Sequence, residues 1–178
     1  MSNIVKKIDI IPFINTGTSE APTWTRIKKS TTFPLTFSPE VKTFDFISSE
    51  YPEEELDKMK PALSQEITMF SDEDDYKVIF EHCFELRTGA DAHRDVLIAF
   101  LQESGTETAP EQRTVYKAWK VDAIIKPNTL DSVAQTISVD LALNSPVIGA
   151  VAITGEHPDQ VPTFIKGSWA GDQFTAAE

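Results

Sequence analysis

The sequence predicts a mainly β protein, a β-sandwich or barrel of long antiparallel strands with one flanking α-helix at about residues 71–87. Two observations predict this fold. Apolar and polar residues alternate along most of the chain, which is the period of a half-buried strand. One stretch breaks the alternation, and its apolar residues recur at helical spacing. Many long strands with a single helix are typical of a sandwich or barrel against which the helix packs.

The alternation is clearest at residues 134–143, where every odd-numbered position from Ile137 to Leu143 is apolar. Segments 62–70 and 114–126 alternate in the same way. Residues 94–101 are apolar on both faces, which is typical of a strand that is covered on both sides. Shorter expected strands lie at 33–37, 44–46 and 147–153.

The predicted helix has recognisable ends. Ser71 suits the N-cap, and four acidic residues at 72–75 fill the first turn, where the helix dipole favours negative charge. Gly89 suits a position just beyond the C-terminal end. The expected apolar stripe consists of Tyr76, Ile79, Phe80, Cys83 and Phe84.

The length of 178 residues favours a single domain. We expect the β-sandwich domain at residues 21–156. An N-terminal arm at 1–20 and a C-terminal arm at 157–178 look extended and irregular. These arms carry apolar residues that would contact another subunit. The residues are Phe13, Phe164 and Trp169.

A strongly acidic stretch is expected to form an extended loop at about residues 48–61. It is either a solvated hairpin loop or a surface that reaches a basic patch on a partner, such as Lys28 and Lys29. A chain that carries both signs in separate segments can pair with copies of itself head to tail. The residues of the expected contact are Glu50, Tyr51, Glu53, Glu54, Glu55 and Asp57.

Composition excludes several classes of function. The net charge of −12 opposes a general affinity for nucleic acid, since phosphate binding needs clustered Lys and Arg, and it opposes docking on anionic lipid. The single cysteine, Cys83, permits neither an internal disulfide nor a zinc cluster. Neither a signal-peptide core nor a spanning apolar run is visible, so we expect no membrane insertion.

The sequence contains no nucleotide-binding glycine pattern and no nucleophile elbow. Asp91, His93 and Asp95 alternate and could hold a metal on one strand face. A polar turn that leads into a strand is the favoured interpretation of that segment. We therefore expect a protein that is not an enzyme and that uses no cofactor and no metal.

The order of elements resembles the major tail tube protein of long-tailed (siphovirus-type) bacteriophages. The resemblance runs from Trp24 to Ile153. It begins with KKSTTFPLTFSPE and the strand–acidic loop–strand unit VKTFDFISSEYPEEELDKMKPALSQEITMF. A helix, an apolar strand and the long pair YKAWKVDAIIKP and AQTISVDLAL follow. The resemblance implies a β-sandwich of which six copies form a ring, with rings stacked into a tube through which the genome enters the host.

The resemblance also implies a location and partners. The protein would assemble with itself in the bacterial cytoplasm and reside in the virion tail, with tape-measure and tail-terminator or baseplate proteins as partners. The acidic loop would stack rings, and the arms would tie neighbouring subunits together. Other phage tail modules of similar fold stay open as alternatives, namely a tail completion or joining protein or the tube of a contractile device. A ligand-binding β-barrel is a further alternative.

Genome DNA would pass through such a tube without specific binding. Carboxylates that line the lumen would repel phosphate, whereas basic residues would bind it. We therefore expect the polar faces of the long strands to line the lumen. The lumen-facing acids would be Glu66, Asp122 and Asp140.

Overall fold

The computed structural model describes residues 4–6, 8–108, 112–153 and 163–177. These residues form a mainly β fold, with one α-helix and one 3-10 helix, which confirms the predicted fold class. The helices are α1 (Asp74–Phe84) and η1 (Gly89–Ala92). The strands are β1 (Ile10–Asn15), β2 (Trp24–Arg26), β3 (Ser30–Thr32), β4 (Leu35–Phe44), β5 (Glu53–Thr68), β6 (His93–Glu107), β7 (Thr114–Asp131), β8 (Thr136–Ala152), β9 (Thr163–Ala170) and β10 (Gln173–Ala176).

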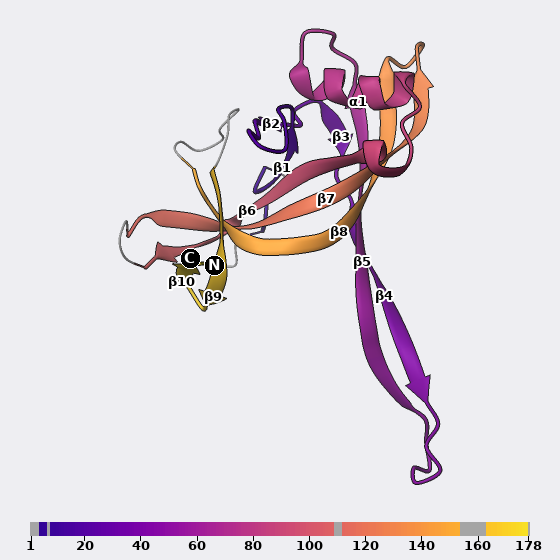
Figure 1. Ribbon diagram of the computed structural model, residues 1–178, viewed down its shortest axis with the longest axis vertical. Coiled ribbons are helices and arrows are strands. Elements are labelled where there is room, and N and C mark those ends of the chain that lie inside the picture. Colours follow the sequence, from indigo (N-terminus) through magenta and orange to yellow (C-terminus); the bar gives the residue numbers. More distant parts are fainter. Residues whose placement is uncertain (1–3, 7, 109–111, 154–162, 178) are drawn as a thin grey trace.

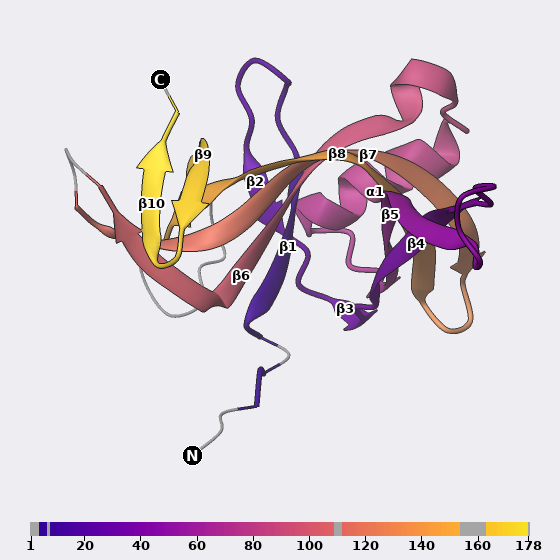
Figure 2. The same ribbon diagram turned by 90° about the horizontal axis from the view of Figure 1, so that it is seen from below.

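Three long antiparallel strands, β6, β7 and β8, form the frame of the molecule (Figure 1). At one end they close into a five-stranded barrel, because β9 pairs with β8, β10 pairs with β9, and β10 returns to β6 in parallel. At the other end β5 joins the sheet beside β8. Figure 2 shows the barrel and α1 on opposite sides of the molecule, with β1 and β2 between them.

The largest core lies between α1 and the inner face of β5, β8, β7 and β6. Val78 and Ile79 of α1 pack in the same cluster as Ile137 and Leu141 of β8. All four odd-numbered apolar residues of the predicted 137–143 face are buried, as expected. Two smaller clusters lie under β1 and β2 and among the barrel strands. The structure also contains no helix, in the part of the chain that it describes, long and apolar enough to cross a bilayer.

The expectation of an irregular N-terminal arm at residues 1–20 is wrong where β1 forms. This strand pairs with β2 and β6, and Phe13 is fully buried within its own chain. Phe13 is therefore a core residue that cannot reach another subunit from this position. Nearly every position of β1 is buried. A strand covered on both faces lacks the alternation that identifies a half-buried strand.

The expected C-terminal arm at 157–178 is likewise a β-hairpin over residues 163–176, formed by β9 and β10. The residues 154–162 lie outside the described part of the chain. Phe164 is half-buried opposite Val151 of β8, and the indole Nε1 of Trp169 donates a hydrogen bond to the Gly149 carbonyl at 2.9 Å. Both aromatic residues thus pack on their own chain.

Gly149 allows the C-terminal hairpin to approach the barrel closely. A Cβ atom at this position would lie 2.3 Å from the Ile165 carbonyl oxygen and 2.5 Å from the Phe164 ring. Real Cβ contacts are never this short, so a larger residue would push β9 away from β8. The glycine therefore fixes the spacing at which the barrel closes.

Helix α1 begins and ends at other residues than the sequence predicts. Its N-cap is Glu73 rather than Ser71, and the cap makes no side-chain hydrogen bond. At the C-terminal end Leu86, with φ of 50°, adopts the left-handed conformation. The Leu86 amide bonds the Cys83 carbonyl and the Arg87 amide bonds the His82 carbonyl. This is the Schellman pattern, which closes the helix before Gly89 is reached.

Phe174 provides a test of the barrel core, because its ring is fully buried among the barrel strands. We expect Phe174→Ala to lower the free energy of unfolding by about 3–5 kcal/mol, through lost burial and a residual cavity. The same substitution at Phe84, whose side chain is 77% exposed, should change it by less than about 0.5 kcal/mol. Urea unfolding measures both values, and equal losses would contradict the assigned core.

His82 is a buried titratable group in the main core. Its Nδ1–H donates to the Val78 carbonyl at 2.8 Å, and its Nε2 finds no hydrogen-bond partner within the described residues. Burial lowers the pKa of His82 below its ordinary value of 6.5. The folded chain therefore keeps this imidazole neutral at a pH where the unfolded chain protonates it.

This difference predicts a pH-dependent stability. As pH falls through the unfolded pKa of about 6.5, the unfolded chain binds the extra proton, so the free energy of unfolding decreases. We expect His82→Gln to reduce that decrease, measured as urea midpoints at several pH values above the carboxylate range. Phe84→Gln, at an exposed side chain that does not titrate, should leave it in place. Identical pH profiles for the wild type and His82→Gln would refute the role of His82.

Candidate assembly surfaces

The first candidate surface is a long hairpin of β4 and β5 that projects from the domain (Figure 1). The pairing runs from Leu35 opposite Leu63 out to Phe44 opposite Glu53. The expected loop at 48–61 is therefore too long, since residues from Glu53 onward belong to β5. The turn takes only the residues between the two strands. The acidic side chains of β5 are exposed to water, so they do not prevent strand formation.

The register sorts the hairpin into two unlike faces. Residues that pair across the ladder lie on the same side of the sheet. In this register the pairs on one side are apolar, so that face is apolar. Every large side chain on its outer part is between 47% and 53% exposed. A register shift between Glu40 and Val41 leaves Asp57 as the extra residue and restores apolar pairing beyond it. The outer part of this face, here called the apolar hairpin face, consists of Phe37, Val41, Leu56 and Met59.

The opposite face of the hairpin is charged and internally paired. Lys42 Nζ lies 2.6 Å from Asp57 Oδ1, and Lys58 Nζ lies 3.4 Å from Glu40. Lys60 also pairs with Glu40, and this hydrogen bond lowers the pKa of the Glu40 carboxyl. Exposed ion pairs of this kind contribute little stability. The charged side chains on this face are thus paired with one another and exposed to water, whereas the apolar hairpin face exposes apolar side chains to water.

The apolar hairpin face continues the main core outward. Leu63, at the root of the hairpin, is fully buried in that core. One step outward, the Phe37 ring meets the Trp119 ring edge-to-face at 6.1 Å between centroids. Trp119 in turn packs edge-to-face on Phe100 at 5.1 Å. Aromatic packing therefore covers one side of Phe37, the innermost residue of the apolar hairpin face, and the residues beyond it lack such a contact.

The predicted contact residues lie at the outer end of the hairpin. Glu50 and Tyr51 are exposed near the turn, and Glu53, Glu54 and Glu55 are exposed on β5. Asp57 differs from the others, because its carboxylate is engaged by Lys42 and Lys58 within the hairpin. At the turn itself Phe44 and Phe46 stack at 5.6 Å.

Sequence reasoning missed the apolar hairpin face. The signal was present as alternation, since Phe37 and Val41 occupy odd positions of β4. Val41 pairs with Leu56 across the ladder, while Met59 lies opposite Pro39 on the same face. Acidic residues outnumber these apolar ones in the same segment and suggest a loop. The alternation acquires meaning only when the two strands are paired in register.

The second candidate surface is the polar face of the long strands. Asp140 lies opposite Ser64, Glu66 lies opposite Ser138, and Asp122 lies opposite Asn144. Neighbouring odd-numbered residues of β5, β7 and β8 are buried on the core side. The three predicted acids therefore share the face that points away from the main core. Their exposure to a lumen stays a prediction.

The acids of this face are held in place by neighbours. Asp140 accepts hydrogen bonds from Ser64 Oγ at 2.5 Å and from Asn128 Nδ2 at 2.7 Å, which lower the pKa of its carboxyl. Asp122 Oδ2 lies 2.7 Å from His93 Nδ1. Lys120, the basic residue least expected here, lies 3.8 Å from Asp95. The carboxylates are thus fixed on a rigid sheet rather than on a loop.

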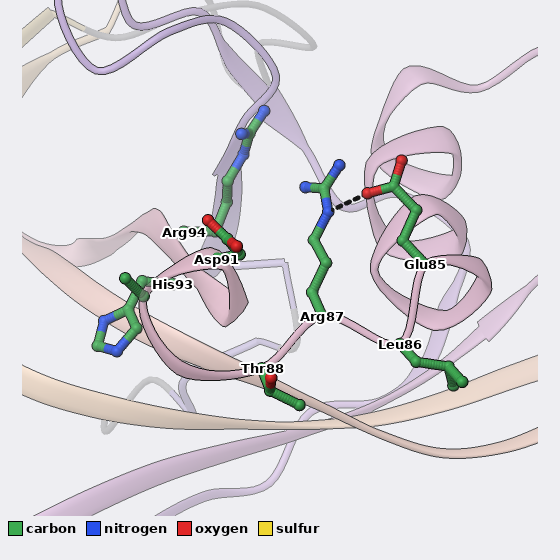
Figure 3. Close-up of a pocket in the computed structure, with 8 residues that line it drawn as sticks. Glu85, Leu86, Arg87, Thr88, Asp91, His93 and Arg94 are labelled. Atoms are coloured by element: carbon green, nitrogen blue, oxygen red, sulfur yellow. Dashed lines mark hydrogen bonds and ion pairs between the residues drawn. The ribbon is translucent and has the colours of Figure 1, made fainter.

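Two of the hollows among the described residues adjoin charged side chains, and neither brings together a metal-binding cluster. One, of about 620 Å³, lies between the end of α1 and β6 (Figure 3). Its arginines serve the fold, because Arg87 Nε bonds Glu85 at 2.5 Å and Arg94 Nε bonds the Asn15 carbonyl at 2.7 Å. The other, of about 400 Å³, adjoins the polar face beside Lys120. Across the described residues, no cluster of three metal-ligating side chains is present.

Comparison with known proteins does not assign the chain to a family. No family model matches the sequence, and no curated protein matches it. The two candidate surfaces therefore rest on the geometry of this chain alone.

Proposed function

We propose that this chain is a structural, self-assembling protein of the phage tail tube type. Copies form hexameric rings that stack into a hollow tube, and the genome passes through the bore. The tube belongs to a virion tail assembled in the host cytoplasm, where it meets tape-measure and terminator or baseplate proteins. This assignment rests on the order of elements and on the two surfaces described above.

The observation that carries the proposal is the projecting hairpin with its uncovered apolar face. Full burial of an aliphatic or aromatic side chain of this size is worth about 1.5–3 kcal/mol. Four such half-exposed side chains, Phe37, Val41, Leu56 and Met59, are a surface typical of a protein–protein contact. The free edge of β4 adds unpaired backbone groups that a neighbour can satisfy. A monomer gains nothing from such a hairpin, whereas an assembly does.

The polar sheet face suits a channel for DNA. Its acids, Glu66, Asp122 and Asp140, repel phosphate. Of the lysines beside them, Lys120 is paired with Asp95, and Lys126 lies opposite Asp140 in the ladder. The ligand-binding alternative is less well supported. Side chains of Val115, Ala150 and Phe174 occupy the space among the barrel strands where a ligand would sit.

Reversing the charge at the hairpin tip tests the stacking role. We expect Glu53→Lys with Glu54→Lys and Glu55→Lys to leave rings intact and to prevent their stacking, because the tip would then repel a basic partner surface. Electron micrographs report ring and tube lengths. The matching triple Gln variant, which removes charge without reversing it, should give shorter tubes than the wild type. Tubes of normal length from the lysine variant would count against this role.

Reversing the charge of the polar face tests the channel role. We expect tubes of Asp122→Lys with Asp140→Lys to retain duplex DNA in a salt-dependent manner, since lysines on a bore neutralise phosphates. Co-sedimentation of tubes with DNA at several salt concentrations provides the measurement. The Asp122→Asn and Asp140→Asn pair controls for the lost hydrogen bonds and should retain far less. Lysine tubes that hold no DNA would show that this face does not line the bore.

A further inference from the structure

Helix α1 has a second apolar side that its own domain covers only in part. Its inward side buries Val78 and Ile79 in the main core. On the outward side Tyr76, Phe80 and Phe84 are four residues apart and form a row of rings, with centroids 5.7 Å and 6.0 Å apart. Tyr76 also packs against the main core, whereas Phe80 is 36% exposed and Phe84 is 77% exposed. The C-terminal part of this aromatic row is therefore an apolar strip in water on an otherwise acidic helix.

A pair of lysines adjoins the N-terminal end of the same helix. The Lys29 ammonium lies 5.0 Å from the centre of the Phe70 ring, just before α1. The Lys28 amide donates to the buried Asp75 carboxylate at 3.3 Å, which ties this segment to the first turn. Both lysine side chains are exposed. The helix end of the molecule thus combines an aromatic row with two positive charges.

The hairpin end carries the complementary combination. It has the apolar hairpin face and, beyond it, the exposed acids Glu53, Glu54 and Glu55. The two ends lie at opposite extremes of the longest axis of the molecule, with α1 at one and the hairpin turn at the other (Figure 1). A hairpin therefore cannot cover the helix of its own chain. It can cover only that of a second copy.

We propose that the aromatic row of α1 is the surface on which the apolar hairpin face of a second copy docks, with the acidic tip against Lys28 and Lys29. This inference rests on the proposed tube function and names the two surfaces that join its layers. Because donor and acceptor are different surfaces at opposite ends, the contact is head to tail and repeats without closing. Two hairpins paired with each other would stop at a dimer and leave the aromatic row in water.

Two surface variants separate the donor from the acceptor. The donor variant carries Leu56→Ser and Met59→Ser, and the acceptor variant carries Phe80→Ser and Phe84→Ser. All four side chains are partly exposed, so both variants should fold, which circular dichroism checks. The control is Val133→Ser, at a side chain that is 92% exposed in the turn between β7 and β8. It should stack like the wild type.

Mixing provides the decisive measurement, by electron microscopy and sedimentation. Each variant alone should give no stacks, and an equal mixture should give stacks of exactly two layers, because one intact donor meets one intact acceptor. Stacking of the acceptor variant at wild-type length would overturn the proposal, and so would a mixture that does not pair. In either case wild-type tubes would still support the tube function. A wild type without rings or tubes would instead refute that function.

A charge exchange keeps the test valid if the serine variants fail to fold. Lys28→Glu with Lys29→Glu should abolish stacking, and adding Glu53→Lys, Glu54→Lys and Glu55→Lys to the same chain should restore it. Restoration in the combined variant supports the assigned contact. Failure of restoration, with folded rings present, places the acidic tip elsewhere.

Discussion

The register of the β4–β5 ladder is the constraint on which the account depends. It places Phe37, Val41, Leu56 and Met59 on one side of a hairpin that projects from the domain. The same side is buried at the root, so the apolar strip is a continuation of the core rather than an isolated patch. A strip that is apolar along its length and covered only at its root is the observation behind our proposal that the molecule is one part of a larger packed structure.

The remainder of the fold holds that hairpin in a defined direction. Strands β6, β7 and β8 are long enough to serve two cores, one under α1 and one in the barrel closed by β9 and β10. Their polar face carries acids that hydrogen bonds fix in place, as Ser64 and Asn128 do for Asp140. A stiff frame holds the hairpin and the acidic face in fixed positions relative to each other, as the proposed repeated assembly would require.

Half-buried strands could be predicted from the sequence, because one buried face imposes alternation, as in Ile137 to Leu143. Strand β1 could not, since both of its faces are covered and the residues on either side of Phe13 in the sequence, Pro12 and Ile14, are also apolar and buried. The C-terminal hairpin of β9 and β10 was missed for a different reason. Its short strands depend on the close approach at Gly149 and on the packing of Trp169, and neither leaves a pattern in the local sequence. The predicted acids of the sheet face do share one side, since that follows from period and register. The apolar hairpin face could be recognised only from the pairing of β4 with β5.

The claim that the hairpin is completed by another copy is tested most directly by amide hydrogen exchange, compared between dilute and concentrated protein. The account predicts that residues 35–44 and 53–61 exchange quickly when the chain is monomeric and become protected as particles form. Protection should appear at α1 over the same concentration range, while the barrel strands stay unchanged. Identical exchange at both concentrations, in a protein that sediments as a monomer throughout, would contradict it.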